Sequence, residues 1–229
     1  MSLLSEVRAA ALKRPWLIAP IAIGTCLQLL LGLFSPTTGI FLIAKTLLGA
    51  AMTVAVTAVF TELWRGDGRR VEAGDFLRTT GLLLMSYPLL ILFGVVSAPL
   101  TYYLLRVDQV SVVYLLICAG KLIAFAATVL SVLAISQRDE STGALQAFGR
   151  GWSLMRANAG FLAGVLIATY LVQEAVVYGV SLAYFSVMTP GSQSGLGLKM
   201  LTGVLATTTP LIGCVAVPLQ AVKSGRLKS

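Results

Sequence analysis

The chain has 229 residues, of which 57% are hydrophobic and only 11% are charged, and its mean hydropathy is +0.90. A soluble core of this size does not bury so large an apolar fraction, so the composition excludes a soluble globular protein and indicates an integral membrane protein. The net charge of +8 fits basic loops beside membrane spans, and we expect no binding to nucleic acid. The absence of histidine excludes histidine-based acid–base catalysis and the usual zinc and haem sites.

The order of apolar and polar stretches predicts an all-α fold, a polytopic bundle in one integral membrane domain over residues 1–229. A short amphipathic helix at 1–14 is expected on the membrane surface ahead of the first span. The six predicted transmembrane helices are 15–34, 40–64, 79–105, 110–137, 159–185 and 199–222. The first apolar run lacks a convincing cleavage site, so we expect no signal peptide to be removed.

Proline and glycine mark the predicted breaks between and within these spans. The basic stretch 65–78 contains a GDG tripeptide that favours a turn, and 188–197 reads as a flexible loop. Pro88 predicts a bend in the third span, and Pro210 and Pro218 are expected to interrupt the sixth.

The basic residues predict the orientation of the chain in the membrane. With a cytoplasmic amino terminus, thirteen Lys and Arg residues lie on the cytoplasmic side, and only Arg106 and Lys199 lie outside. Cytoplasmic loops carry such an excess of Lys and Arg. We therefore expect a multi-pass protein of a bacterial cytoplasmic (inner) membrane with both termini inside.

The polar stretch 138–158 predicts an amphipathic helix, the interfacial elbow, between the fourth and fifth spans. Its apolar residues recur at helical spacing and are Leu145, Phe148, Trp152 and Met155. The polar residues between them are Gln146, Arg150, Ser153 and Arg156. Ser141 or Thr142 can cap the helix start, and Trp and Arg are typical of headgroup depth. The alternative is an ordinary loop with a few helical residues.

A similar elbow is expected in the first cytoplasmic loop. Phe76-Leu77-Arg78 occupies the same place as Phe148-Gly149-Arg150, and Leu82 then matches Leu154 at the same offset. A repeated unit of span, basic loop and span predicts two halves related by an axis along the membrane normal. Chance identity in so biased a composition is the alternative.

Charged residues inside spans are costly and are candidates for function. Lys121 and Glu174 lie at similar depths in the fourth and fifth spans, so we expect them to face the bundle interior and to form an ion pair. The pair either fixes helix register or forms part of a proton or ion path. Glu62, near the end of the second span, is expected to make a solvated contact with Arg65 or Arg69.

No catalytic motif stands out in this sequence. The loop GSQSG resembles a hydrolase elbow, but its central residue is Gln193 and there is no histidine base. Asp67, Glu72 and Asp75 alternate with arginines and are typical of a solvated loop rather than a metal site. No Walker-type glycine loop is present. We expect no enzyme activity, no cofactor and no metal.

The run from Ala144-Leu145 to Trp152-Ser153-Leu154-Met155-Arg156-Ala157-Asn158 carries a family resemblance. It is similar to the "AL..SW.L.R.N" elbow of a bacterial six-span family that includes the membrane domain fused to some glycerophosphodiester phosphodiesterases. Gly151 stands where those proteins have serine. The resemblance implies a helical bundle with surface elbows and no catalytic site, because the phosphodiesterase activity belongs to a separate soluble domain. The LKRP sequence before the first span also resembles permease subunits of ABC-type exporters.

The leading functional hypothesis is a non-enzymatic accessory or scaffold subunit that docks a partner through its two cytoplasmic elbows. The expected partners are the lipid bilayer, its anionic headgroups, and another protein or a second copy of the chain. A transporter or permease subunit that moves a small or amphipathic substrate is the alternative, with Lys121 and Glu174 lining the path. A third possibility is a lipid-binding role for the basic elbows.

Overall fold

A computed structural model describes residues 2–33, 39–66, 72–86, 109–138, 143–187 and 194–227, with a few single positions between 87 and 108. This part of the chain is helical and contains no strand, so the all-α prediction is confirmed. Three helical stretches in it are long and apolar enough to cross a membrane, and they are Val110–Ser136, Ala159–Val180 and Met200–Lys223. Apart from those single positions, the second half of the predicted third span lies outside the described residues.

The amino-terminal part forms four helical elements, which are α1 (Leu3–Leu12), a 3₁₀ turn (Pro15–Leu17), α2 (Ile18–Leu33) and α3 (Gly39–Arg65). Ser2 caps α1, because its side chain accepts a hydrogen bond from the Ser5 backbone N–H at 3.3 Å. α1 is a helix within the predicted surface segment 1–14, and α2 and α3 lie in the residue ranges of the first two predicted spans.

Helix α4 (Ala73–Met85) corrects the prediction for the first cytoplasmic loop. The helix begins six residues before the expected start of the third span, so Phe76 and Arg78 lie on it rather than in a loop. It ends at Met85, and the Ser86 hydroxyl donates to the Leu83 carbonyl at 2.6 Å. A Ser hydroxyl bonded to the last turn competes with continuation of the helix, which is consistent with the bend predicted near Pro88.

The middle of the chain forms α6 (Val110–Ser136), α7 (Ala144–Ala157) and α8 (Ala159–Val187), so the predicted elbow helix is confirmed as a helix. Ser141 and Thr142 lie outside the described residues. The residue at the N-cap of α7 is Gly143, which has no side chain for capping. The chain turns sharply at Asn158, whose side chain donates to the Leu154 carbonyl at 2.9 Å.

The last predicted span is α9 (Ser194–Leu211), a π-helical turn (Ile212–Ala216) and α10 (Val217–Lys223) in succession. Ser194 to Gly197, expected in a flexible loop, belong to the first turn of α9. Pro210 lacks the N–H that would continue the helical ladder, and the wider π turn follows it directly. The helix is therefore widened between Pro210 and Pro218 and not broken.

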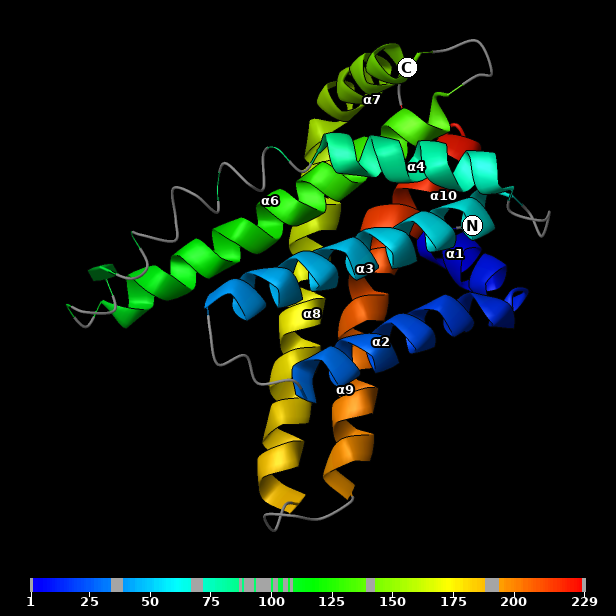
Figure 1. Cartoon of the computed structure of the whole chain (residues 1–229). Helices are drawn as coiled ribbons and strands as arrows, with labels where there is room; N and C mark the ends of the chain where they lie inside the picture. The colour runs from blue at the N-terminus through cyan, green and yellow to red at the C-terminus, as the bar shows by residue number, and fades with distance from the viewer. Residues whose placement is uncertain are drawn as a thin grey trace.

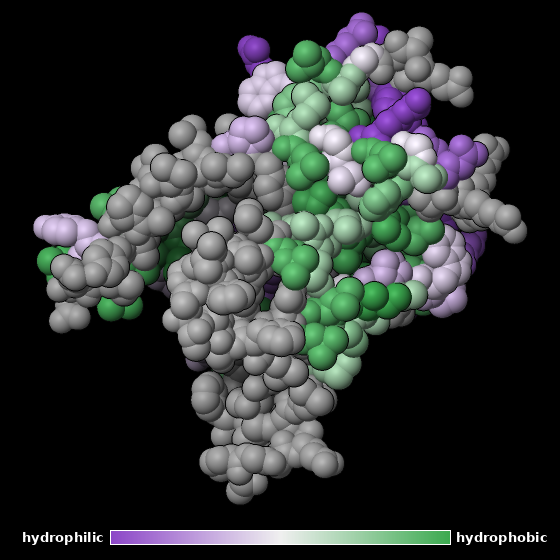
Figure 2. Space-filling view, viewed as in Figure 1, coloured by the Kyte–Doolittle hydropathy of each residue, from purple (hydrophilic) through white to green (hydrophobic). Residues whose placement is uncertain are grey.

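The helices meet at one end of the molecule, where α1, α4, α7 and α10 lie and where both termini are found (Figure 1). A buried cluster at this end joins residues from both halves of the chain, including Val7, Phe60, Trp64, Val132 and Val215. The most hydrophilic residues drawn in Figure 2 also gather there. We name this region the basic end.

The carboxyl end of α3 is held at the basic end by two cations. Arg14 donates from Nη1 to the Trp64 carbonyl at 2.9 Å, and Lys223 donates from Nζ to the Arg65 carbonyl at 3.3 Å. Cations are favourable at a helix carboxyl terminus because its carbonyl groups carry partial negative charge. Arg226 also pairs with Glu6 at 2.6 Å, which ties the carboxyl-terminal segment to α1.

Candidate functional site

Helix α7 crosses the end of α6 at very short range. A Cβ atom built on Gly151 would lie 2.6 Å from the Ala134 backbone nitrogen and 2.8 Å from its Cα. No larger side chain fits such a contact without movement of one helix. Gly151 therefore sets the distance between α7 and α6.

The side chains of α7 fall on a buried face, which includes this contact, and on exposed faces beside it. Ala147, Gly151 and Leu154 are buried and form the packing face. Leu145 and Trp152, in contrast, are 80% and 53% exposed. Gln146 and Ser153 are exposed on a separate flank, whereas the exposed Arg156 lies on the same side as Trp152. The predicted apolar face is thus distinct from the packing face, which sequence reasoning missed although Ala147 and Gly151 stand one turn apart.

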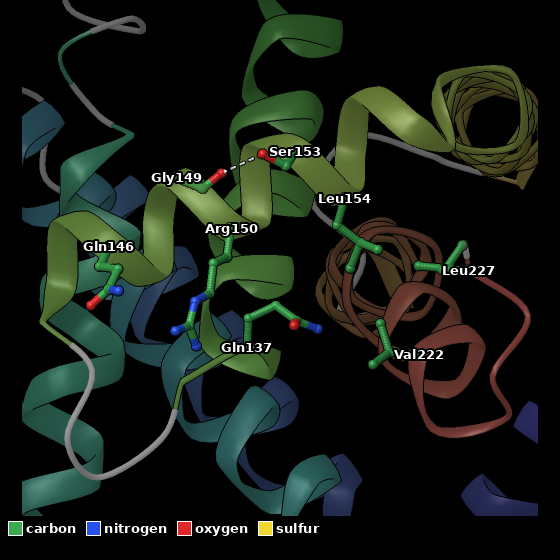
Figure 3. A pocket seen from close by; sticks show the side chains of 8 residues that line it. All are labelled: Gln137, Gln146, Gly149, Arg150, Ser153, Leu154, Val222 and Leu227. Carbon is green, nitrogen blue, oxygen red and sulfur yellow. Dashed lines mark hydrogen bonds between the residues drawn. The ribbon is translucent and has the colours of Figure 1, made fainter. Parts of the chain in front are cut away.

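A cleft of about 670 Å³ lies on the polar flank of α7, and we name it the polar cleft (Figure 3). Its lining residues are Gln137, Gln146, Gly149, Arg150, Ser153, Leu154, Val222 and Leu227. Arg150 extends from α7 towards Gln137 at the end of α6, while Leu154, Val222 and Leu227 gather on the other side (Figure 3). The polar cleft therefore combines a cation and two amides with an apolar wall.

A second hollow, of about 300 Å³, lies on the other flank of α7, and we name it the apolar groove. It is lined by Trp152, Met155, Arg156, Ala159, Leu162, Ala163 and Leu166. Of the predicted elbow residues, Arg150 lines the polar cleft, whereas Trp152, Met155 and Arg156 line the apolar groove. Leu145 and Phe148 line neither hollow.

The first elbow, α4, is fixed to α3 by a buried polar contact. The Thr79 hydroxyl donates to the Glu62 carboxylate, and the exposed fraction of Glu62 is only 7%. The prediction that Glu62 is solvated was therefore wrong, because Thr79 of α4 covers its carboxylate; Arg69, one of its two expected partners, lies outside the described residues. Phe76 packs against the buried cluster between α3 and α4, whereas Arg78 is exposed.

Helix α4 also contacts α6 and the connection that follows it. The Ser131 hydroxyl donates to the Leu82 carbonyl at 3.2 Å. Arg138, whose side chain is 10% exposed, donates to Asp75 at 2.9 Å. The first elbow is thereby linked to the segment from which α7 begins.

Lys121 and Glu174 form the predicted ion pair, and Cys118 lies 2.7 Å from the Tyr170 hydroxyl between the same two helices. The expected position in the bundle interior was only partly right. The Lys121 and Glu174 side chains are 39% and 25% exposed. The side chain of Gln173, one position before Glu174, donates to the Ala206 carbonyl of α9 at 3.0 Å.

The described residues contain no group of three or more Cys, Asp or Glu side chains that could hold a metal ion. Cys26, Cys118 and Cys214 are free thiols. A scan against models of known families, a search of curated proteins and a search of solved structures each gave no match to this chain.

Proposed function

We propose that this chain is a six-span protein of the bacterial cytoplasmic membrane with both termini on the cytoplasmic side. It acts as a non-enzymatic accessory or scaffold subunit that docks a partner protein at its basic end. The position of α1, α4, α7 and α10 together at this end supports the orientation, because their basic residues then face a single aqueous side (Figure 1).

The observation that carries the docking role is the polar cleft. Its lining includes the Gln137 and Gln146 amides and the Arg150 guanidinium beside the apolar side chains of Leu154 and Val222. Polar groups that fix orientation around an apolar anchor point are typical of recognition sites. The fitting partner is a cytosolic segment with an acidic or amide group next to an apolar side chain.

The rigid attachment of α7 supports the same role. Gly151 allows direct backbone contact with α6, so the cleft wall keeps a fixed distance from the bundle. A preformed site binds with less loss of conformational entropy than a mobile one. The exposed Leu145 and Trp152 side chains, in turn, suit a helix that lies in the headgroup region.

Site-specific photo-crosslinking in intact cells tests this proposal. A photoreactive amino acid at Gln146 or Ser153 lies in the polar cleft, whereas the matched control at Leu171 lies on the exposed face of α8. We expect one discrete crosslinked protein from both cleft positions and none from Leu171. Monomer alone at all three positions would contradict the docking role.

Transport is the second candidate function, and the Lys121–Glu174 pair supports it. An ion pair that is partly exposed within predicted spans is reachable by a polar substrate or by water. Under this alternative, Lys121→Met and Glu174→Gln abolish flux in reconstituted vesicles while the protein stays folded. Unchanged flux in both variants would remove the pair from a transport mechanism.

A further inference from the structure

The apolar groove lies where α7 turns into α8, and its two walls come from these two helices. Ala159 and Ala163 stand one turn apart on α8, and their short side chains leave space between Met155 and Leu166. Leu162 is buried and forms part of the floor. Apart from Arg156, every residue that lines the groove is apolar, so its interior fits a hydrocarbon chain.

The rim of the groove carries the positive charge of Arg156, which suits an anion. Arg156 is exposed and forms no ion pair with any residue that the structure describes. A guanidinium binds phosphate through two parallel hydrogen bonds, which an ammonium cannot do. The amino terminus of α8 begins three residues later, at Ala159, and helix amino termini attract anions through their free N–H groups.

Trp152 indicates the depth at which the rim of the groove lies in a bilayer. Its side chain lines the groove one turn before Arg156 and is 53% exposed. Tryptophan is enriched at the level of lipid headgroups, with the acyl chains beginning just below it. With Trp152 at that level, Arg156 meets the phosphate layer and Ala163 and Leu166 lie along the acyl chains.

We propose that the apolar groove binds one acyl chain of an anionic glycerophospholipid, whose phosphate lies between Arg156 and the first turn of α8. The inference rests on the proposed position of α7 at the membrane surface, but it does not require a protein partner. The acyl chain fills the apolar groove between α7 and α8, and the headgroup lies beside the exposed flank of α7.

Fluorescence quenching by brominated lipids tests the site. Trp16→Phe removes one of the two exposed tryptophans and leaves Trp152 together with Trp64, which is 1% exposed and serves as an internal background. This protein is reconstituted in phosphatidylcholine vesicles that contain a minor fraction of brominated phosphatidylglycerol or, separately, brominated phosphatidylcholine. We expect an apparent affinity about tenfold higher for the anionic lipid, the factor that corresponds to one good charge-assisted contact.

Two substitutions separate the headgroup contact from the chain contact. Arg156→Gln removes the preference for the anionic lipid, and Ala163→Leu fills the groove and reduces quenching by both lipids. Ala168→Leu, at an exposed position of α8 outside the groove, is the matched control and leaves the preference unchanged. An unchanged melting temperature in all three variants shows that each is folded.

Three outcomes would overturn the inference. Equal quenching by the two lipids in the Trp16→Phe protein indicates ordinary contact with bulk lipid. Relief of quenching by soluble glycerol phosphate indicates a site for the anion without an acyl chain. A preference that survives Arg156→Gln removes the assigned phosphate ligand. Failure of crosslinking at Gln146 and Ser153, with the lipid preference intact, would contradict the docking role alone.

Discussion

The two elbows, α4 and α7, attach to the preceding helices by different means at matching positions. Glu62 and Thr79 meet between α3 and α4, and Ala134 and Gly151 meet between α6 and α7. Each residue of the first pair precedes its counterpart in the second by the same number of positions, as do Phe76 and Phe148, and Leu82 and Leu154. Helices α3 and α6 also have the same length, 27 residues.

The comparison teaches that matching positions in the two elbows make two different kinds of contact. In the first elbow a buried hydrogen bond joins helices whose side chains keep their backbones apart. In the second, both side chains are minimal, and backbone atoms approach directly. The hydrogen-bonded contact is destabilised when one partner is removed, whereas the backbone contact is destabilised when any atom is added. The matching positions are those that the predicted internal repeat requires, and the repeat stays a prediction.

The largest effect is expected from Gly151→Ala, which adds one carbon to the close contact. The new Cβ meets Ala134 backbone atoms that cannot rotate away, so α7 must shift. We expect a loss of about 1–3 kcal/mol in the free energy of unfolding. The measurement is reversible unfolding in mixed detergent micelles.

Gly149→Ala is the matched control for that substitution, because nothing lies within 4 Å of a Cβ built there. Alanine in an exposed helix interior is more favourable than glycine by roughly 0.5–1 kcal/mol. Equal effects of the two substitutions would mean that the close contact between α7 and α6 does not exist in the protein.

The next effect is expected from Thr79→Val, which leaves the buried Glu62 carboxylate without its hydroxyl donor. We expect a loss of about 1–3 kcal/mol, since an unsatisfied buried acceptor loses its solvation without compensation. Thr79→Ser keeps the hydroxyl and is the control.

The double variant Glu62→Ala with Thr79→Gly gives the first elbow the two residues that the second elbow has at the matching positions. We expect its loss of unfolding free energy to be smaller than the sum of the losses in the two single variants. Additive losses would argue against a direct bond.

The smallest effect is expected from Asp75→Asn, which weakens the link between α4 and Arg138. Asp75 is 43% exposed, so solvent screens the pair and the loss stays below about 1 kcal/mol. Glu72→Gln, at an exposed N-cap position whose side chain makes no capping bond, is the control. A loss as large as that of Thr79→Val would show that the link between the elbows, rather than the contact within each one, holds α4 in place.

Local pattern alone was enough to predict most helices and several of their ends. The apolar runs of α3, α6 and α8 are long, and breaker residues bound them, so length and hydropathy locate them without any knowledge of packing. The start of α4 was missed because basic and acidic residues in its first two turns resemble a solvated loop. The depth argument correctly paired Lys121 with Glu174, since helical rise is the same in every span.

The sequence by itself determined that this is a helical membrane protein with an amphipathic helix after α6. Composition is a property of the chain as a whole, and the helical period of apolar residues involves only positions a few residues apart. Only the tertiary structure decided that Glu62 is buried under Thr79, that Gly151 touches the backbone of α6, and that two hollows flank α7. These features depend on how closely two helices approach and at what angle they cross. That geometry is set by small residues on both helices at once, and no single stretch of sequence contains it.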